Sequence, residues 1–163
     1  DIKKSTGGNV TGRVHIALAL IEKGYIKSVE EGFSKLLAEG RPAYAERERL
    51  TPADVIGMIV ESGGIPVLAH PKYLGKGEAE FDELLVELKS YGLMGIEAYY
   101  ADNSYLETVK FLNFARKHTL ITTGGSDFHG GVRTDVMLGT GRGNLKVGYE
   151  SFLKVKEALK SFD

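Results

Sequence analysis

Helix-like and strand-like patterns alternate along residues 51–123, and this alternation constrains the fold more than any other feature of the sequence. Apolar residues three and four apart predict helices at residues 52–62, 81–91 and 104–117, with a final helix at residues 150–161. Strands are predicted between them at residues 65–69, 95–99 and 120–123, and the first is apolar throughout, which indicates a strand buried on both faces. Because the connections are short, the strands are expected to be parallel and joined by right-handed helical crossovers. The sequence therefore predicts an α/β fold.

A smaller helical segment precedes this alternation. Apolar spacing predicts a short helix at residues 14–23. Ser28 and Glu31 then have the spacing of a capping box, in which the hydroxyl and the carboxylate satisfy free amide groups at a helix start. We therefore divide the chain into a helical segment, residues 1–50, and the αβ units of residues 51–163.

Composition and charge exclude several classes of protein. The 163 residues suit one compact domain with one core. With 21 basic and 22 acidic residues and no long block of one sign, the chain lacks a broad basic surface for a polyanion. Cysteine is absent, which excludes disulfides and thiolate metal sites. The longest apolar runs are far shorter than the roughly 20 residues of a membrane span, and no apolar core of a signal peptide follows Lys3 and Lys4, so we expect a cytoplasmic protein.

Metal-ligand residue types occur at or near the end of each predicted strand. His70 follows the first strand, Glu97 lies in the second, and the third runs into GGSDFHG at residues 124–130, which contains Asp127 and His129. Because the βα loops of parallel strands converge at one edge, these side chains are expected to lie close together. Two imidazoles and two carboxylates suit Zn, Mn or Fe better than Ca, which prefers oxygen ligands alone.

Each of these residues also has an ordinary structural interpretation. His70 alone is typical of a hydrogen-bonded histidine in a fold, Glu97 of a salt-bridged carboxylate, and the GGSDFHG segment of a glycine-rich turn. These explanations are independent of one another, whereas a metal site would account for all three features at once. His118 ends a predicted helix, where a cationic side chain is favoured by the helix dipole, and we interpret it as structural.

Two cations stand just beyond candidate ligands. Lys72 and Arg133 could neutralise a substrate phosphate, although solvated side chains of these types are the commoner case. The sequence contains no dinucleotide fingerprint, P-loop or nucleophile elbow, so it gives no support to dinucleotide, NTP or acyl-serine chemistry.

Taken together, the motifs resemble those of the PHP (polymerase and histidinol phosphatase) family. The likeness is carried by GGIPVLAHP at residues 63–71, GIE at 95–97 and GGSDFHG at 124–130. RVHIA at residues 13–17, the helical segment after it and PAY at 42–44 resemble the helical insertion of one branch. That branch contains metal-dependent phosphoesterases, among them nucleoside 3',5'-bisphosphate phosphatases and 5'-to-3' RNA exonucleases.

This resemblance implies a fold and a site. The fold would be the C-terminal part of a distorted seven-stranded (β/α) barrel, with a small helical insertion at its N-terminal end and a cluster of two or three divalent ions, Mn, Zn or Fe, at the strand ends. By the resemblance His70, Asp127 and His129 are metal ligands, and Glu97 matches a further position of the metal motifs. Arg13 and His15 match positions that bind substrate phosphate. The implied substrate is a nucleotide or a short nucleic-acid end.

The chain also departs from the family pattern. The family's opening His-x-His strand, an Asp-His pair and a further Glu do not occur, so about the first half of the barrel is absent. We therefore expect an incomplete and inactive fragment of a phosphoesterase, with an exposed sheet edge that favours self-association. Two alternatives remain open. One is a noncatalytic, structural or regulatory PHP-like module; the other is an amidohydrolase-type hydrolase, which also uses His and Asp at strand ends.

Overall fold

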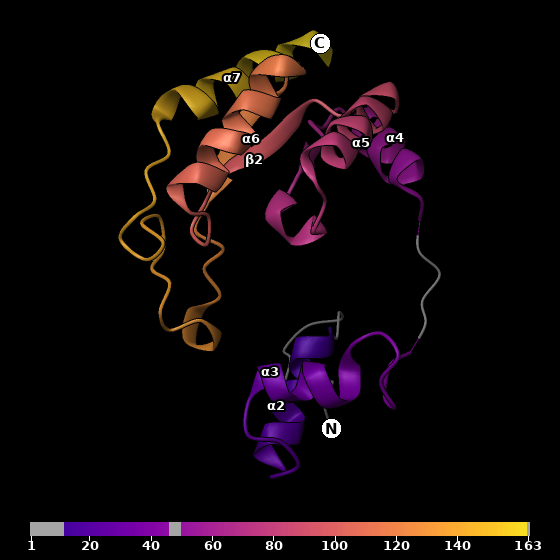
Figure 1. The fold of residues 1–163 in the computed structure, drawn as a ribbon, viewed down its shortest axis with the longest axis vertical. Coiled ribbons are helices and arrows are strands. Elements are labelled where there is room, and N and C mark those ends of the chain that lie inside the picture. The colour runs from indigo at the N-terminus through magenta and orange to yellow at the C-terminus, as the bar shows by residue number, and fades with distance from the viewer. Residues whose placement is uncertain (1–11, 46–49, 163) are drawn as a thin grey trace. The chain divides into compact units, whose positions relative to one another are not determined.

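The computed structural model describes residues 12–45 and 50–162 (Figure 1). The chain divides into two compact units, Asp1–Arg49 and Leu50–Asp163. The predicted helical segment includes residues 1–11 and 46–49, which lie outside the described residues.

The first unit is a small helical cluster. It contains α2 (Arg13–Glu22), α3 (Val29–Gly32) and the π-helical turn η1 (Phe33–Leu37). Ser28 Oγ accepts the backbone N–H of Glu31 at 3.2 Å, as the capping-box spacing predicts, whereas the Glu31 carboxylate accepts the N–H of Lys27 rather than that of Ser28. The buried core of the cluster consists of Ala17, Ile26 and Leu37.

The second unit contains a three-stranded parallel sheet in the order β1–β2–β3. Its strands are β1 (Val67–Leu68), β2 (Gly95–Tyr100) and β3 (Ile121–Gly125). This confirms the predicted α/β class and the parallel arrangement. The prediction for β1 was too long, because only two residues of the run 65–69 pair with β2, and both are half-buried rather than buried on both faces. The seven strands of a whole barrel are not present among the residues described.

Four α-helices accompany the sheet: α4 (Pro52–Glu61), α5 (Glu78–Ser90), α6 (Tyr105–Lys117) and α7 (Tyr149–Leu159). Thr51 and Ser104 cap α4 and α6 with side-chain oxygens. Helix α5 begins before the predicted Phe81, because Glu80 turns back to accept the N–H of Gly77 and satisfies the helix start there. A single 3₁₀ turn, η4 (Lys160–Phe162), follows α7.

The core of this unit lies between β2 and helices α4, α5 and α6. Phe81 of α5 packs against Phe111 and Phe114 of α6, with ring centroids 5.7 and 4.9 Å apart. Figure 1 shows α6 running alongside β2. The buried cluster comprises Ile56, Phe81, Leu85, Leu88, Leu93, Ile96, Ala98, Phe111, Ala115 and Leu120. This packing fixes the three strands and therefore the loops that leave their carboxyl ends.

An irregularity in β2 shapes the edge where those loops start. The register with β3 shifts between Glu97 and Tyr99, which pair with Thr123 and Gly124. A Cβ at Gly124 would lie 2.4 Å from the Tyr99 carbonyl oxygen, so only glycine allows the strands this close approach. In a regular strand Glu97 and Tyr100 would point to opposite faces. The bulge offsets this alternation, and both side chains reach residues of neighbouring strand-end loops.

Over the ranges that the structure covers, no helix combines the length and the apolar character of a membrane span.

Candidate metal centre

His70 stands at the carboxyl end of β1 in a strained backbone conformation. Its φ and ψ are 47° and 49°, the left-handed region that a side chain with a Cβ rarely adopts. The conformation is held by Glu97 of β2, whose Oε2 accepts the His70 backbone N–H at 2.9 Å. The imidazole is 43% exposed, and its Nε2 lies 3.7 Å from the same Glu97 oxygen. Glu97 therefore fixes the backbone of His70 and lies beside its ring.

Asp127 approaches the same imidazole from the loop after β3. Its Oδ1 lies 3.8 Å from His70 Nε2. Asp127 also has a positive φ, 54°, so two of the three non-glycine residues with positive φ in the described chain are predicted ligands. Backbone strain of this kind persists only where the surroundings enforce it, and it concentrates at functional sites.

His129 lies two residues further along the loop, with its ring orientation set by the backbone. Its Nδ1 is 2.8 Å from the carbonyl oxygen of Asp127. Because a carbonyl oxygen only accepts hydrogen bonds, Nδ1 must be the donor, which leaves Nε2 unprotonated in the neutral ring. A histidine whose Nδ1–H is tied to a backbone carbonyl is the usual arrangement for metal ligation through Nε2. The orientation fits the predicted role, although the imidazole is more than half exposed.

Glu97 is a carboxylate in an unfavourable place. Its side chain is 13% exposed. Burial raises the pKa of Glu97, the Asp127 charge raises it further, and the His70 N–H and ring offset part of this rise. A bound cation would stabilise the ionised form.

The donor set can be tested against the size of a divalent ion. The separations of 3.7 and 3.8 Å around His70 Nε2 are too long for hydrogen bonds. Two atoms that each lie about 2.1 Å from a zinc ion are about 3.4 Å apart at the tetrahedral angle and about 3.8 Å apart at about 130°. In chemistry and in pairwise distance, these residues therefore fit a divalent cation. No three His, Asp or Glu side chains in the described ranges form a group that could hold the ion by themselves, so the fit is that of a partial donor set.

A second layer of contacts holds Asp127, and sequence reasoning missed most of it. Asp127 Oδ2 accepts hydrogen bonds from the Tyr100 hydroxyl at 3.0 Å and from Arg133 at 2.8 Å. Burial above all raises the pKa of Tyr100, so its hydroxyl stays protonated as a donor. Arg133 also binds both carboxylate oxygens of Asp102, at 3.1 and 2.9 Å.

Asp102, just beyond the end of β2, ties three loops together. Its carboxylate accepts hydrogen bonds from Tyr73 at 2.9 Å, from Arg133 and from Arg142 at 3.1 Å. Burial alone would raise the pKa of Asp102, but these donors outweigh it and lower the pKa to about 2. Its backbone carbonyl accepts from Lys72 at 2.6 Å. The interpretation of Lys72 and Arg133 as phosphate-binding cations is therefore weakened, because both are engaged by protein oxygens.

Arg13 and His15, the predicted phosphate ligands, belong to the first unit, whereas the strand-end residues belong to the second. The Arg13 guanidinium lies over the Phe33 ring, 5.6 Å from its centroid, and donates to the Leu37 carbonyl at 3.3 Å. His15 Nδ1 accepts the Gly12 N–H at 3.0 Å, which leaves Nε2 as the protonated nitrogen in the neutral ring. The two side chains share the first turn of α2, and both retain donor capacity for an anion.

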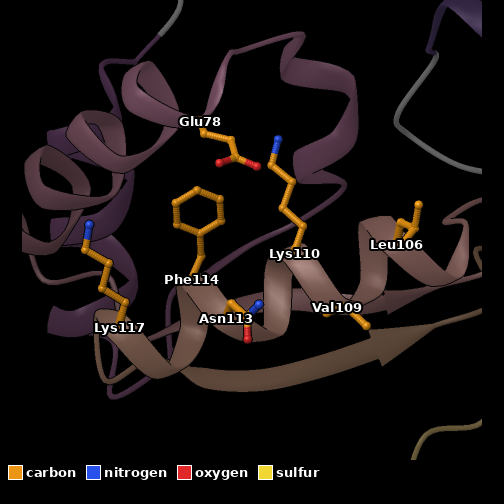
Figure 2. A pocket seen from close by; sticks show the side chains of 7 residues that line it. All are labelled: Glu78, Leu106, Val109, Lys110, Asn113, Phe114 and Lys117. Atoms are coloured by element: carbon orange, nitrogen blue, oxygen red, sulfur yellow. The ribbon is translucent and has the colours of Figure 1, made fainter.

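A pocket of about 370 Å³ lies elsewhere in the second unit, along α6 and beside the start of α5 (Figure 2). Figure 2 shows Glu78 of α5 and Lys110, Phe114 and Lys117 of α6 around it. None of the predicted ligands lines this pocket. It therefore adds nothing to the candidate metal centre.

Comparisons with curated proteins find relatives of several named activities. A 3',5'-nucleoside bisphosphate phosphatase of Chromobacterium violaceum is 33% identical over 117 residues, which are 72% of this chain and 41% of that protein. The 5'-3' exoribonuclease Rnm of Escherichia coli is 33% identical over 123 residues, 76% of this chain and 42% of that protein. A phosphoribosyl 1,2-cyclic phosphate 1,2-diphosphodiesterase of Eggerthella lenta is 30% identical over 117 residues. The chain spans less than half the length of these relatives.

Two solved structures have a similar fold. A Bifidobacterium adolescentis protein named as a metal-dependent phosphoesterase superposes on 94% of this chain and 53% of its own, with a TM-score of 0.76 and 25% identity. A Chromobacterium violaceum structure named as an amidohydrolase, with bound sulfate and no metal, covers 93% of this chain and 51% of its own, with a TM-score of 0.70 and 28% identity. No profile of a known protein family matches the chain.

Proposed function

We propose that this chain, which its motifs and its phosphoesterase relatives establish as a member of the PHP family, contributes to metal-dependent hydrolysis of phosphate esters. One observation carries the proposal. Glu97 Oε2 and Asp127 Oδ1 both lie 3.7–3.8 Å from His70 Nε2, at the carboxyl edge of one parallel sheet. The substrate class proposed is a nucleotide or an oligonucleotide end.

His70, Asp127 and His129 would hold Mn, Zn or Fe, with Glu97 as a further ligand. Bound divalent ions lower the pKa of water, orient a phosphate and stabilise charge on the leaving oxygen. The protein's part is to select, through the Asp127 carbonyl, the tautomer of the neutral His129 ring that leaves Nε2 as the ligating atom, and to keep His70 in its left-handed conformation through Glu97. Arg13 and His15 would bind nonreacting phosphate oxygens with guanidinium and imidazole N–H groups.

The chain supplies only part of such a site. It spans less than half the length of its curated relatives, and its described residues contain no three-ligand group. We propose that the remaining ligands come from residues outside this chain, that residues 1–50 are the helical insertion of the family, and that the chain alone is inactive. A cytoplasmic location is part of the same proposal.

The test is a hydrolysis assay on two proteins, the 163-residue chain and the same chain extended by its natural upstream sequence. The substrates are a nucleoside 3',5'-bisphosphate, a short RNA with a 5'-phosphate and a cyclic amide. We expect the extended protein to release phosphate or mononucleotide, to lose this activity in EDTA and to regain it with Mn²⁺, whereas the chain alone stays inactive.

Other outcomes decide against parts of the proposal. Hydrolysis of the cyclic amide alone would favour the amidohydrolase alternative, which the similar amidohydrolase structure keeps open. Absence of any metal-dependent activity in the extended protein would favour a noncatalytic module. Activity of the 163-residue chain alone would contradict its proposed incompleteness.

We also propose that the chain associates with a second copy of itself. In the described sheet, β3 pairs only with β2, and α7 beside it exposes Phe152 and Leu153. A cavity of about 340 Å³ lies between β3 and α7 and includes Phe152 in its lining. Sedimentation velocity should show an oligomer that Phe152→Asp dissociates. The control Leu106→Asp, at an exposed position of α6, should leave it intact; a monomeric wild type would contradict the proposal.

A further inference from the structure

The two oxygens of the Asp127 carboxylate face different partners. Oδ1 lies 3.8 Å from His70 Nε2 and 3.6 Å from His129 Nδ1, on the side of the predicted ligands. Oδ2 accepts hydrogen bonds from Tyr100 at 3.0 Å and from Arg133 at 2.8 Å. One oxygen thus lies beside the two imidazoles, and the other is held by the protein.

Arg133 is itself held in place. One terminal nitrogen, Nη2, donates to both oxygens of Asp102, at 3.1 and 2.9 Å, while the other, Nη1, donates to Asp127. The planar guanidinium thus bridges two carboxylates through two nitrogens, which a single ammonium nitrogen does not do. Side chains of Arg133 and Asp102 are 22% and 15% exposed, so water competes weakly for these contacts. Asp102 also accepts hydrogen bonds from Tyr73 and Arg142.

We propose that Asp102 and Arg133 are positioning residues for the metal centre: Asp102 fixes the guanidinium of Arg133, which in turn fixes the rotation of the Asp127 carboxylate so that Oδ1 faces the imidazoles. The inference rests on the proposed function, because it assigns Asp127 as a metal ligand. Hydrogen-bonded outer partners of ligating carboxylates commonly determine metal affinity.

This role differs from phosphate binding. One terminal nitrogen of Arg133 serves Asp127 and Tyr100, and the other serves Asp102, so the guanidinium is surrounded by protein oxygens. Its charge is balanced by two carboxylates within hydrogen-bond distance. Because its charge is neutralised in this way, Arg133 is better suited to orient the Asp127 carboxylate than to attract a substrate phosphate.

The chain offers a matched control for Arg133. Arg142 lies in the same connection between β3 and α7 and also binds Asp102. Among the described residues its guanidinium pairs with Asp102 and Asp135, not with Asp127. Replacing either arginine removes one cation that binds Asp102. Only replacement of Arg133 removes a contact to the predicted ligand.

The experiment measures the divalent-metal affinity of the extended protein used in the hydrolysis assay, by titration with Co²⁺, followed through its d–d absorption, and with Mn²⁺. Arg133→Met is expected to weaken binding about 10–100-fold, and Asp102→Asn to weaken it in the same direction, whereas Arg142→Met leaves it within about twofold. Arg133→Lys, which keeps the charge but loses the two-nitrogen bridge between Asp102 and Asp127, should fall between wild type and Arg133→Met. Thermal unfolding of each variant checks that it is folded.

The outcomes separate the two proposals. Equal metal affinity in wild type, Arg133→Met and Asp102→Asn would overturn the positioning role and leave the proposed function standing. Equal weakening by Arg133→Met and Arg142→Met would also overturn it, since a general loss of loop stability would then explain the effect. If the extended wild-type protein bound neither Co²⁺ nor Mn²⁺, both the metal centre and the inference would be contradicted.

A metal-free measurement adds a second criterion. In ¹H–¹⁵N spectra, Arg133→Met and Asp102→Asn should shift the amide signals of Asp127 and His129, whereas Arg142→Met should leave those two signals near their wild-type positions. Unchanged Asp127 and His129 signals in Asp102→Asn would show that Asp102 does not act through Arg133, and would overturn the inference even if metal affinity fell.

Discussion

His118 and His70 of the second unit both lie beside carboxylates, but they differ in exposure, contact distance and backbone conformation. His118 ends α6, is 9% exposed, and has its Nε2 2.7 Å from Asp82 of α5, a hydrogen-bond distance. His70 follows β1, is 43% exposed, and has two carboxylate oxygens at 3.7 and 3.8 Å from its Nε2. His118 has an ordinary helix-terminal backbone, whereas His70 adopts a strained left-handed conformation.

The difference separates a structural histidine from a candidate functional one. At His118 the fold satisfies the ring directly, and the contact joins α6 to α5. At His70 the backbone is strained, and the ring is held between two carboxylates without a hydrogen bond to either. Unmade hydrogen bonds among convergent ligand-type groups indicate a site for a cation.

The largest expected effect is on metal affinity, and substitutions of the two histidines should have opposite consequences. His70→Asn should lower Co²⁺ affinity by about 100-fold or more, because loss of a ligand should cost at least as much as loss of an outer partner. Asparagine tolerates the left-handed backbone, so the free energy of unfolding should change little. His118→Ala should instead lower the free energy of unfolding by about 1–3 kcal/mol and leave Co²⁺ affinity unchanged.

Urea unfolding and Co²⁺ titration of both variants check this prediction. If His118→Ala weakened metal binding as much as His70→Asn, the two histidines would not be distinguishable by role, and the contrast drawn from their geometry would be wrong.

The same contrast shows how far the sequence carries the fold. Alternation of patterns predicted the helices and the parallel strands to within a few residues, because those patterns record burial directly. The run 65–69 was misjudged because a strand buried on both faces and a short strand paired on one side have the same local composition. The bulge at Glu97 was not predicted, since Gly124 reveals its purpose only when Tyr99 of the neighbouring strand lies against it.

For the site, the sequence supplied the residues and not their second layer. His70, Glu97 and Asp127 were predicted to meet because parallel strands end at one edge, and they do lie together. Whether they and His129 bind metal stays a prediction. Asp102 follows β2 as an acidic residue just beyond a strand end, a signal that could have marked it. Its pairing with Arg133, 31 positions away, depends on loop conformation that no local pattern records.

A smaller effect concerns Asp102 and acid. Its pKa is lowered from 3.8 to about 2 in the folded protein, so its stabilising contribution is complete above pH 3.8 and is lost as the pH falls through about 2. Asp102→Asn should therefore lower the free energy of unfolding by about 1–3 kcal/mol at neutral pH, and the difference from wild type should vanish as the pH approaches 2.

Urea unfolding across this pH range, in EDTA, is the measurement. Asp135→Asn is the control, because Asp135 also pairs with Arg142 but lies at an exposed position of the connection between β3 and α7. A difference between wild type and Asp102→Asn that stayed constant down to pH 2 would show that the Asp102 charge is not what stabilises the three loops.

The smallest effect has the opposite sign. Burial raises the pKa of Glu97 above its ordinary value of 4.5, so the folded state binds this proton more tightly and stability falls as the pH rises through the window above 4.5. Glu97→Gln removes that cost while its amide oxygen still accepts the His70 N–H. In EDTA it should raise the free energy of unfolding at neutral pH by about 1 kcal/mol or less, with no gain below pH 4.5, and it should weaken Co²⁺ binding. If Glu97→Gln were less stable than wild type at neutral pH, the ionised Glu97 carboxylate would stabilise the fold, as Asp82 does through its contact with His118. The strand-end cluster would then resemble that structural pair more than its geometry indicates.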